Sequence, residues 1–373
     1  MKVLFVYSQV EKNLETSGEA KKMMMQKDAM EANGVESDII YHVCNGRFFK
    51  LYIRAIGLPI YSNKFIRELL DRIQKGKYDT LYIRKHIFDY SFVRMIKRVR
   101  KEYPSLNVIV EIPTYPYDRE WESFVDWPFL IKEKYQKVKI KKYIDYFITF
   151  SNDDEIFGVP CIKMKNGVDP DVLTRRVIHD SKDNRIELLG VAGVETWHGF
   201  DRIIRGMHEY YANGGTYDII FHIVGNGGEI GNLKKLVSKC ELEDRVIFHG
   251  PKHGDELNRM FDISDIGVGS LGMYRIGMQE GYTLKLKEYS ARGIPFIYAY
   301  DDPLIELCDS SFYRKYTNND DAISMESIVA FHNDNLNCGY DKLADEMRAF
   351  AYDKLTWKEQ MRTIIEFLRK EDK

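Results

Sequence analysis

Short apolar stretches alternate with amphipathic stretches along most of the chain. Apolar runs of about four to eight residues are typical of buried strands, and apolar residues that recur every three or four positions are typical of helices. In the first half this pattern predicts strands at 3–8, 38–43, 80–84, 107–112 and 146–150, and helices at 19–33, 63–74 and 92–102. Such an alternation of strands and helices indicates a doubly wound parallel sheet.

The alternation restarts after residue 180. It predicts strands at 186–191, 217–224, 245–249, 266–270 and 295–298, and helices at 200–211, 230–240, 255–261 and 283–292. Because 373 residues is long for one hydrophobic core, we expect an α/β protein with two Rossmann-like domains, 1–168 and 169–350. The stretch 351–373 contains an amphipathic segment at 357–369, which is expected to form a helix that packs back on the first domain.

The composition is that of a globular protein, with 44% hydrophobic and 30% charged residues. No apolar run approaches the roughly 18 residues of a membrane span. The start MKVLFVYSQV predicts a buried strand and not a signal peptide, because its apolar run is short and acidic residues soon follow. The five cysteines are scattered and include no CxxC pair, which favours reduced thiols in a cytoplasmic protein over zinc or disulfides.

Charge is distributed unevenly along the chain. The net charge is −2, but residues 44–150 hold 22 Lys and Arg against 12 Asp and Glu, and they are rich in aromatic residues. This mixture is found at anionic membrane surfaces and also on ordinary solvated helices. Nucleic acid is not expected as a partner, because no helix-turn-helix, RNP or zinc-finger pattern is present. The stretch WPFLIKEKYQKVKIKK (127–142) predicts a basic amphipathic helix and peripheral contact with an anionic membrane, on the inner face of the cell membrane.

Two glutamates, Glu280 and Glu288, flank the start of the predicted helix 283–292 in EGYTLKLKE. Thr283 is a candidate N-cap, because its hydroxyl could accept hydrogen bonds from the first-turn amides. The amides of 281–284 and the positive end of the helix dipole attract an anion such as a phosphate, and ionised carboxylates accept hydrogen bonds from hydroxyl groups. The pattern therefore suits a phosphate with hydroxyl groups on both sides, as in a sugar nucleotide. The alternative is a solvated helix with a Lys285–Glu288 pair.

Several loops that follow strands of the second domain are expected at the same rim, since ligands of open α/β sheets bind at the carboxyl ends of the strands. Together these features resemble the retaining glycosyltransferases of GT-B fold in glycosyltransferase family 4. The resemblance covers nearly the whole chain. It rests on the E-x7-E element (Glu280 and Glu288) followed by ARGIPFI, on VGNGG, VIFHG and NGVD, and on EIPTYPYDRE and WHGFDRII, which are similar to a branch used in bacterial surface polysaccharide and capsule synthesis.

The resemblance implies a GT-B fold, in which two Rossmann-like domains face each other across a cleft. It implies transfer of a hexosyl unit from a nucleoside diphosphate sugar to a glycan acceptor, expected to be lipid-linked. Glu288 would bind the ribose hydroxyls and Glu280, as a catalytic residue, the hydroxyls of the transferred sugar. The other donor-binding candidates are Gly281, Tyr282, Thr283, Leu284, Gly225, Asn226, Gly227 and His253.

Two places depart from the family pattern. Many members bind the diphosphate with an Arg and a Lys in the first loop of the second domain, where this chain has Ala192 and His198. Lys285 in the first helical turn is the expected catalytic replacement, with Arg202 as a second donor-side cation, while His198 could instead order the TWHG turn. On the acceptor side the family often has a His after the fourth strand; the candidates here are Thr114, Tyr117 and Asp118, with Ser17 and Gly18 before the first helix.

No metal or other cofactor is expected. The single D-x-D, Asp169-Pro170-Asp171, is better explained as a cap, and no His or Cys cluster has the spacing of metal ligands. A helix dipole and a lysine can stabilise a leaving diphosphate in place of Mg²⁺. Two other readings stay open: a GT-B sugar-nucleotide 2-epimerase and a non-catalytic nucleotide-sugar-binding subunit.

Overall fold

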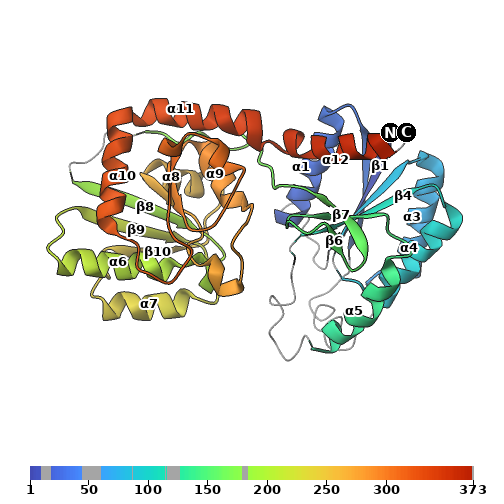
Figure 1. The fold of residues 1–373 in the computed structure, drawn as a ribbon, viewed down its shortest axis with the longest axis horizontal. Coiled ribbons are helices and arrows are strands. Elements are labelled where there is room, and N and C mark those ends of the chain that lie inside the picture. The colour runs from blue at the N-terminus through green and yellow to red at the C-terminus, as the bar shows by residue number, and fades with distance from the viewer. Residues whose placement is uncertain are drawn as a thin grey trace. The chain divides into compact units, whose positions relative to one another are not determined.

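The computed structural model describes residues 1–9, 18–43, 60–85, 87–113, 115, 127–178 and 184–371. The chain divides into two compact units, drawn in Figure 1. Unit 1 contains Met1–Lys165 and Trp357–Lys373, and unit 2 contains Asn166–Thr356. Residues 351–355 thus belong to unit 2, and the last helix belongs to unit 1.

Unit 1 is built on a seven-stranded sheet with the order β2-β1-β3-β4-β5-β7-β6. Its strands are β1 (Lys2–Gln9), β2 (Glu36–Val43), β3 (Thr80–Arg84), β4 (Asn107–Ile112), β5 (Tyr146–Thr149), β6 (Glu155–Ile156) and β7 (Val159–Lys163). Neighbouring strands are parallel except β6 and β7, which form a hairpin. The five predicted strands are confirmed; the hairpin was not predicted, because β6 is too short to show a periodicity.

Helices cover both faces of this sheet (Figure 1). One face packs against α3 (Asn63–Gly76), α4 (Tyr90–Glu102) and α5 (Trp127–Ile140), and the other against α1 (Gly18–Ala32) and α12 (Trp357–Glu371). Successive side chains of β1 alternate between the two apolar layers, Leu4 in one and Phe5 in the other, which explains its continuous apolar run. The predicted C-terminal helix is therefore present, and it packs against α1 through an apolar layer that includes Met361 and Ile365.

Unit 2 is built on a six-stranded parallel sheet with the order β10-β9-β8-β11-β12-β13. Its strands are β8 (Arg185–Val191), β9 (Asp218–Val224), β10 (Val246–Gly250), β11 (Ile266–Val268), β12 (Phe296–Tyr298) and β13 (Tyr313–Lys315). Its helices are α6 (Phe200–Ala212), α7 (Ile230–Lys239), α8 (Asp255–Asp262), α9 (Leu284–Arg292), α10 (Met325–Cys338) and α11 (Tyr340–Phe350). Short helical turns lie at η3 (Thr196–His198), η4 (Met273–Ile276), η5 (Ile305–Leu307) and η6 (Ser310–Phe312), and a π-helical turn at Ala351–Leu355 follows α11.

The structure confirms the predicted class of two α/β units with parallel sheets. The predicted strand and helix ends lie within about two residues of the observed ones, as expected for pattern-based boundaries. Only β13, α10 and α11 of unit 2 lack a counterpart among the predicted strands and α-helices. In the part of the chain that is described, no helix is long and apolar enough to span a bilayer.

Candidate functional site

The first turn of α9 is capped differently from the prediction. Thr283 is the N-cap residue, with an extended backbone (φ −69°, ψ 145°), but its side chain forms no capping hydrogen bond. The Thr283 hydroxyl instead bonds the Tyr300 hydroxyl, 2.6 Å away, because the buried phenol needs a polar partner. The predicted capping contact is therefore wrong. Since Thr283 does not cap them, the first amides of α9 stay available to an anionic ligand.

The amide of Gly281 corrects the predicted set of free donors. It donates to the Asp301 carbonyl at 2.9 Å, and the Asp301 amide donates back to the Gln279 carbonyl at 2.8 Å. These two bonds hold the loop that carries Glu280 against the segment after β12. The amides available at this rim are therefore those closer to the helix, at Thr283 and Leu284.

Lys285 supplies a cation beside these amides. Its Nζ atom is buried, has no hydrogen-bond partner among the described residues, and lies 5.5 Å from the centre of the Phe200 ring. Burial lowers the pKa of Lys285 to about 7, although Glu288 opposes the shift. The alternative Lys285–Glu288 pair does not form. A buried ammonium without a paired anion costs free energy, which is typical of a position built for a charged ligand.

Glu288 is held by an arginine one turn further along α9. Its Oε1 accepts a hydrogen bond from Arg292 Nε at 3.0 Å, and the Glu288 side chain keeps 32% of its exposure. Arg292 is fixed in turn by Asn258 Oδ1 at 2.9 Å and by the Phe261 ring, 4.2 Å from the guanidinium. The carboxylate is thus oriented at the rim, and its second oxygen can accept hydrogen bonds from ligand hydroxyl groups.

Glu280 forms a pair with an aromatic side chain. The Tyr282 hydroxyl donates to Glu280 Oε1 at 2.5 Å. Burial, and then the Glu280 carboxylate, raise the pKa of Tyr282, so this phenol stays protonated at neutral pH. Glu280 thus lies in the loop before α9 and Glu288 in the second turn of the helix, and a side-chain hydrogen bond helps to orient each carboxylate.

His198 lies in the turn after β8 and contributes a neutral ring. Its Nδ1 accepts a hydrogen bond from the Glu195 amide at 3.0 Å, which places the ring proton on Nε2. Burial, and then the Lys285 charge, lower the pKa of His198 to about 3. The histidine orders the η3 turn, as its structural alternative predicts, and Nε2–H is a hydrogen-bond donor near Lys285.

The glycine-rich loop after β9 packs directly on the loop after β8. A Cβ on Gly225, whose φ is 129°, would lie 1.8 Å from the Ala192 carbonyl oxygen. A Cβ on Gly227 would lie 2.1 Å from the Val194 carbonyl oxygen, and the Asn226 carbonyl accepts from the Val194 amide at 2.9 Å. These glycines are needed because the two loops approach so closely.

The chain is similar to known glycosyltransferases. Residues 171–337, which include all the donor-side candidates, match the family described as glycosyl transferases group 1. Unit 2 carries a glycosyltransferase group 1 domain. The amylovoran biosynthesis glycosyltransferase AmsK of Erwinia amylovora is 23% identical over 271 residues, 72% of this chain. The chain spans 57% of the length of that curated relative.

Solved glycosyltransferase structures resemble this chain in fold over nearly its whole length. A glycosyltransferase from Rickettsia africae superposes with a TM-score of 0.62 and 14% identity, over 99% of this chain and 98% of its own. Anabaena Alr3699/HepE, solved in complex with UDP, also gives a TM-score of 0.62, with 13% identity over 99% and 100% of the two chains. At such identities the likeness concerns the fold, and together with the two parallel sheets it confirms the predicted GT-B fold.

Arg202 of the glycosyltransferase domain does not serve as a free cation, which corrects the prediction. Its side chain is buried, and its guanidinium donates to the Asp321 carbonyl at 2.6 Å and to the Thr317 carbonyl and Asn319 Oδ1 at 3.1 Å each. A further bond goes to the Leu271 carbonyl. These oxygens occupy the N–H donors of the Arg202 guanidinium. Arg202 therefore connects α6 to the 317–321 segment.

His253 lies in an exposed loop between β10 and α8 of the same domain. The next residue, Gly254, has φ 53° and ψ −132°, a backbone conformation that essentially only glycine adopts. It directly precedes the first turn of α8. The loop is anchored at its start, because the Gly225 amide donates to the Gly250 carbonyl at 2.9 Å. This bond joins the loop of His253 to the glycine-rich loop.

On the acceptor side, Ser17, Thr114, Tyr117 and Asp118 lie outside the described residues, and Gly18 is the first residue of α1. The structure shows instead a buried charged cluster at the carboxyl ends of β3 and β4. Glu111 accepts from Arg84 at 2.6 Å and from Tyr82 at 2.5 Å, and lies 3.4 Å from Lys22 of α1. Burial lowers the pKa of Lys22 to about 8. A glutamate inside the apolar strand NVIVEI was the signal that could have revealed this cluster.

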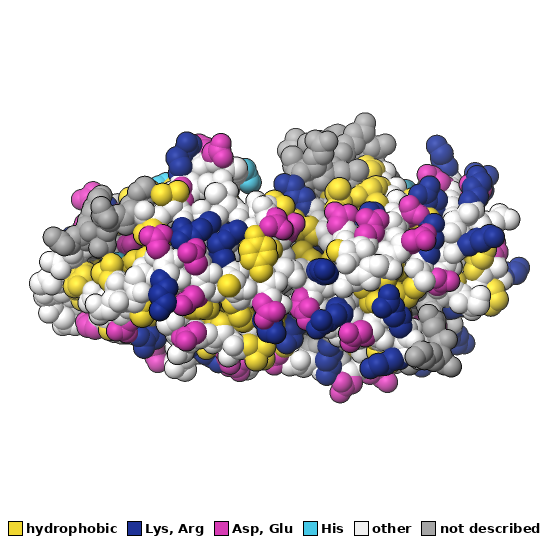
Figure 2. Space-filling model, turned by 90° about the horizontal axis from the view of Figure 1, so that it is seen from above, with side chains coloured by type: hydrophobic (Ala, Val, Ile, Leu, Met, Phe, Trp, Pro, Cys, Tyr) yellow, Lys and Arg dark blue, Asp and Glu magenta, His cyan; other side chains and the backbone are white. Residues whose placement is uncertain are grey.

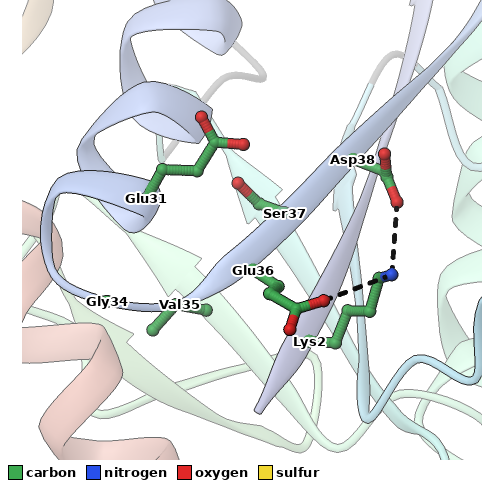
Figure 3. A pocket seen from close by; sticks show the side chains of 7 residues that line it. All are labelled: Lys2, Glu31, Gly34, Val35, Glu36, Ser37 and Asp38. Carbon is green, nitrogen blue, oxygen red and sulfur yellow. Dashed lines mark ion pairs between the residues drawn. The ribbon is translucent and has the colours of Figure 1, made fainter.

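A hollow at the other edge of the unit 1 sheet is lined by Lys2, Glu31, Gly34, Val35, Glu36, Ser37 and Asp38 (Figure 3). Lys2 Nζ lies 3.4 Å from Glu36 and 3.8 Å from Asp38, so its charge is paired within the hollow. These residues stand at the amino ends of β1 and β2, whereas open α/β sheets bind ligands at the carboxyl ends. We therefore place the candidate site at α9.

Proposed function

We propose that this protein is a retaining glycosyltransferase of family 4, which moves a hexosyl unit from a nucleoside diphosphate sugar to a lipid-linked glycan in surface polysaccharide synthesis. The observation that carries the proposal is the buried Lys285 ammonium, which lacks a partner among the described residues at the start of α9. Glu280 in the loop before α9 and Glu288 in its second turn each accept a side-chain hydrogen bond. Groups for binding an anion and groups for binding hydroxyls are thereby combined at the start of one helix.

The donor is expected to bind along this rim. Glu288 accepts hydrogen bonds from the ribose hydroxyls, and Glu280 accepts them from the transferred sugar. The diphosphate faces the first amides of α9 and the Lys285 ammonium, with His198 Nε2–H as a further donor. A uridine nucleotide is the first choice, because the related fold of Anabaena Alr3699/HepE has been solved in complex with UDP-glucose.

Catalysis on this proposal consists of positioning and charge stabilisation. As the glycosidic bond to the diphosphate breaks, negative charge grows on the leaving oxygens beside Lys285 and the positive end of the α9 dipole. The acceptor hydroxyl attacks from the face that the diphosphate leaves, and a diphosphate oxygen takes its proton. The anomeric configuration is thereby retained. No metal is required, because the lysine and the helix supply the positive charge.

The acceptor is expected to be a growing polysaccharide intermediate. Support comes from the similarity to AmsK, a glycosyltransferase of amylovoran biosynthesis. The basic and aromatic character of residues 44–150 agrees with a lipid-linked substrate at a membrane. Cytoplasmic location, with peripheral attachment, is part of the same proposal.

The test is a donor screen followed by product analysis. Thermal unfolding is measured with uridine and guanosine diphosphates and their sugars, since a ligand that binds the folded state raises the unfolding temperature. The stabilising donor is then incubated with membrane lipid extract. A free nucleoside diphosphate and a lengthened lipid glycan, with the anomeric configuration of the donor, are expected.

Other products would overturn the proposal in distinct ways. An epimerised donor would assign a sugar-nucleotide 2-epimerase, and binding without turnover would assign a non-catalytic subunit. An inverted glycosidic bond would refute retention alone. Chelation of divalent metals should leave the rate unchanged; a loss restored by Mg²⁺ would refute the metal-independent mechanism.

A further inference from the structure

Helix α5 of unit 1 carries apolar side chains on the side turned away from the sheet. Ile131, Tyr135 and Val138 are 45%, 70% and 67% exposed. Their i, i+4, i+7 spacing places them within an arc of about 60° on the helix surface. We call these three residues the α5 stripe. Large apolar side chains aligned in this way are not explained by packing against the parts of unit 1 that the structure describes.

The opposite side of α5 packs against the rest of unit 1. Ile140 is buried in the apolar layer below α4 and α5, and Glu133 is buried and lies 3.2 Å from Lys85. Glu133 is also the only carboxylate between residues 131 and 142. The outer side of the helix therefore carries no negative charge in this segment.

Lysines line both edges of the α5 stripe. Lys134 lies on one edge and Lys139 on the other, while Lys141 and Lys142 follow directly after the last residue of the helix; all four are exposed. The neighbouring helix α4 adds exposed basic side chains at Lys97 and Lys101, while its Arg98 lies 3.5 Å from Glu102. The apolar stripe is thus flanked mainly by the lysines of its own segment.

The far side of the same sheet is different. On α12 the basic residue Arg362 pairs with Glu359 at 2.5 Å and lies 3.7 Å from Glu366. Figure 2 shows the surface over α12, where Lys and Arg side chains are mixed with Asp and Glu. Among the described residues, the outer side of α5 between 131 and 142 therefore carries charge of one sign, whereas α4 and α12 carry both signs.

We propose that α5 docks on an anionic lipid bilayer and lies in its interface. The α5 stripe enters the boundary between headgroups and acyl chains, and the lysines reach lipid phosphates with their charged ends while their stems stay against the apolar side chains. Tyr135, with an apolar ring and a polar hydroxyl, suits this depth. Three side chains are too few for the roughly 800 Å² per partner of a stable protein interface, whereas a bilayer adapts to a narrow stripe.

Docking deepens the peripheral attachment included in the proposed function, but it can be tested apart from sugar transfer because it requires neither donor nor acceptor. Binding is measured by flotation of the full chain with vesicles of phosphatidylcholine, alone or mixed with phosphatidylglycerol. Binding is expected on the anionic vesicles only, and it should weaken as salt shortens the Debye length. A failure of wild type to float with anionic vesicles at low salt would overturn the proposal, whatever the enzymatic assays show.

Matched charge variants locate the contact. K134E/K139E reverses two charges on α5, and K358E/K370E reverses two exposed charges on α12, so both variants have the same net charge. Since each lysine at an anionic surface contributes roughly a fivefold factor in partitioning, the α5 variant should bind at least about 25-fold more weakly. The α12 variant should stay within about twofold of wild type. Equal losses would show a general charge effect and refute docking through α5.

The apolar contribution needs its own variant. Y135S/V138S keeps every charge and should lower partitioning to anionic vesicles at least about fivefold, because the apolar insertion is lost. Unchanged thermal unfolding and nucleotide binding would show that the fold is intact. Unaltered vesicle binding of Y135S/V138S, or equally tight binding of wild type to a soluble polyanion such as polyphosphate, would show a polyanion-binding surface and overturn the bilayer assignment.

Discussion

Replacing Lys285 by methionine separates a ligand-binding role from a structural one, because the two roles predict opposite effects. The buried ammonium lacks a partner among the described residues, and its pKa is lowered to about 7, from about 10.4 in an unfolded chain. The unfolded state therefore binds more protons between these values. The cost to folding is full below pH 7 and declines as the pH rises toward 10.

The lowered pKa corresponds to a cost of a few kcal/mol at neutral pH. Methionine has a similar length and no charge, so Lys285→Met should raise the free energy of unfolding by about 1–3 kcal/mol without ligand. The same change removes a charged partner of the diphosphate, worth about 1.5–3 kcal/mol. Affinity for a nucleoside diphosphate should fall about 10- to 150-fold, while affinity for the nucleoside should hardly change.

The assays are thermal unfolding without ligand and calorimetry with the nucleoside diphosphate and the nucleoside. Lys287 is a matched control two residues along α9, because its buried ammonium is paired with Asp302 at 2.5 Å. Lys287→Met leaves a buried carboxylate without its cation and should destabilise the fold by about 3–5 kcal/mol. A Lys285→Met variant that is less stable than wild type and binds the diphosphate normally would refute the reasoning.

Four further outcomes are expected. Because an anionic ligand favours the charged form of Lys285, affinity for the nucleoside diphosphate should decrease as the pH rises above about 7, and a flat profile between pH 7 and 9 would contradict this. Glu288→Gln should weaken nucleoside diphosphate binding by about 1–3 kcal/mol in calorimetry, with the unfolding temperature nearly unchanged. Glu280→Ala should lower turnover and spare nucleoside diphosphate affinity, so equal losses in both would mean that its contact is misassigned. Gly225→Ala should lower the free energy of unfolding by at least about 2 kcal/mol in denaturant titration, because its Cβ would strike the Ala192 carbonyl.

Much of the fold could be predicted from the sequence because its causes are local. β3 and β4 have the predicted bounds, since five successive buried residues between polar segments leave little choice of structure. The position of α9 was also readable, because Thr283 precedes its first turn and Gly293 takes the left-handed conformation after its last one (φ 76°). In contrast, β13 has three residues, and α10 contains the polar run HNDNLNC. Neither segment shows a hydrophobic periodicity strong enough to predict a strand or a helix.

The sequence by itself thus determined the order of strands and helices and the placement of Glu280, Lys285 and Glu288 around one helix start, because each depends on residues within a few positions of one another. The GT-B class was expected from a resemblance in motifs spread along the chain. Only the tertiary structure decided which side chains are left to meet a ligand. Arg202 looked available, but carbonyls more than a hundred positions along the chain occupy its guanidinium. For Lys285 the sequence left open a surface pair with Glu288, but the side chain is buried without a partner among the described residues. Whether a charged side chain is buried, and which group it pairs with, depends on the residues that the fold brings close to it. The spacing of residues in the sequence does not show which distant residues become neighbours.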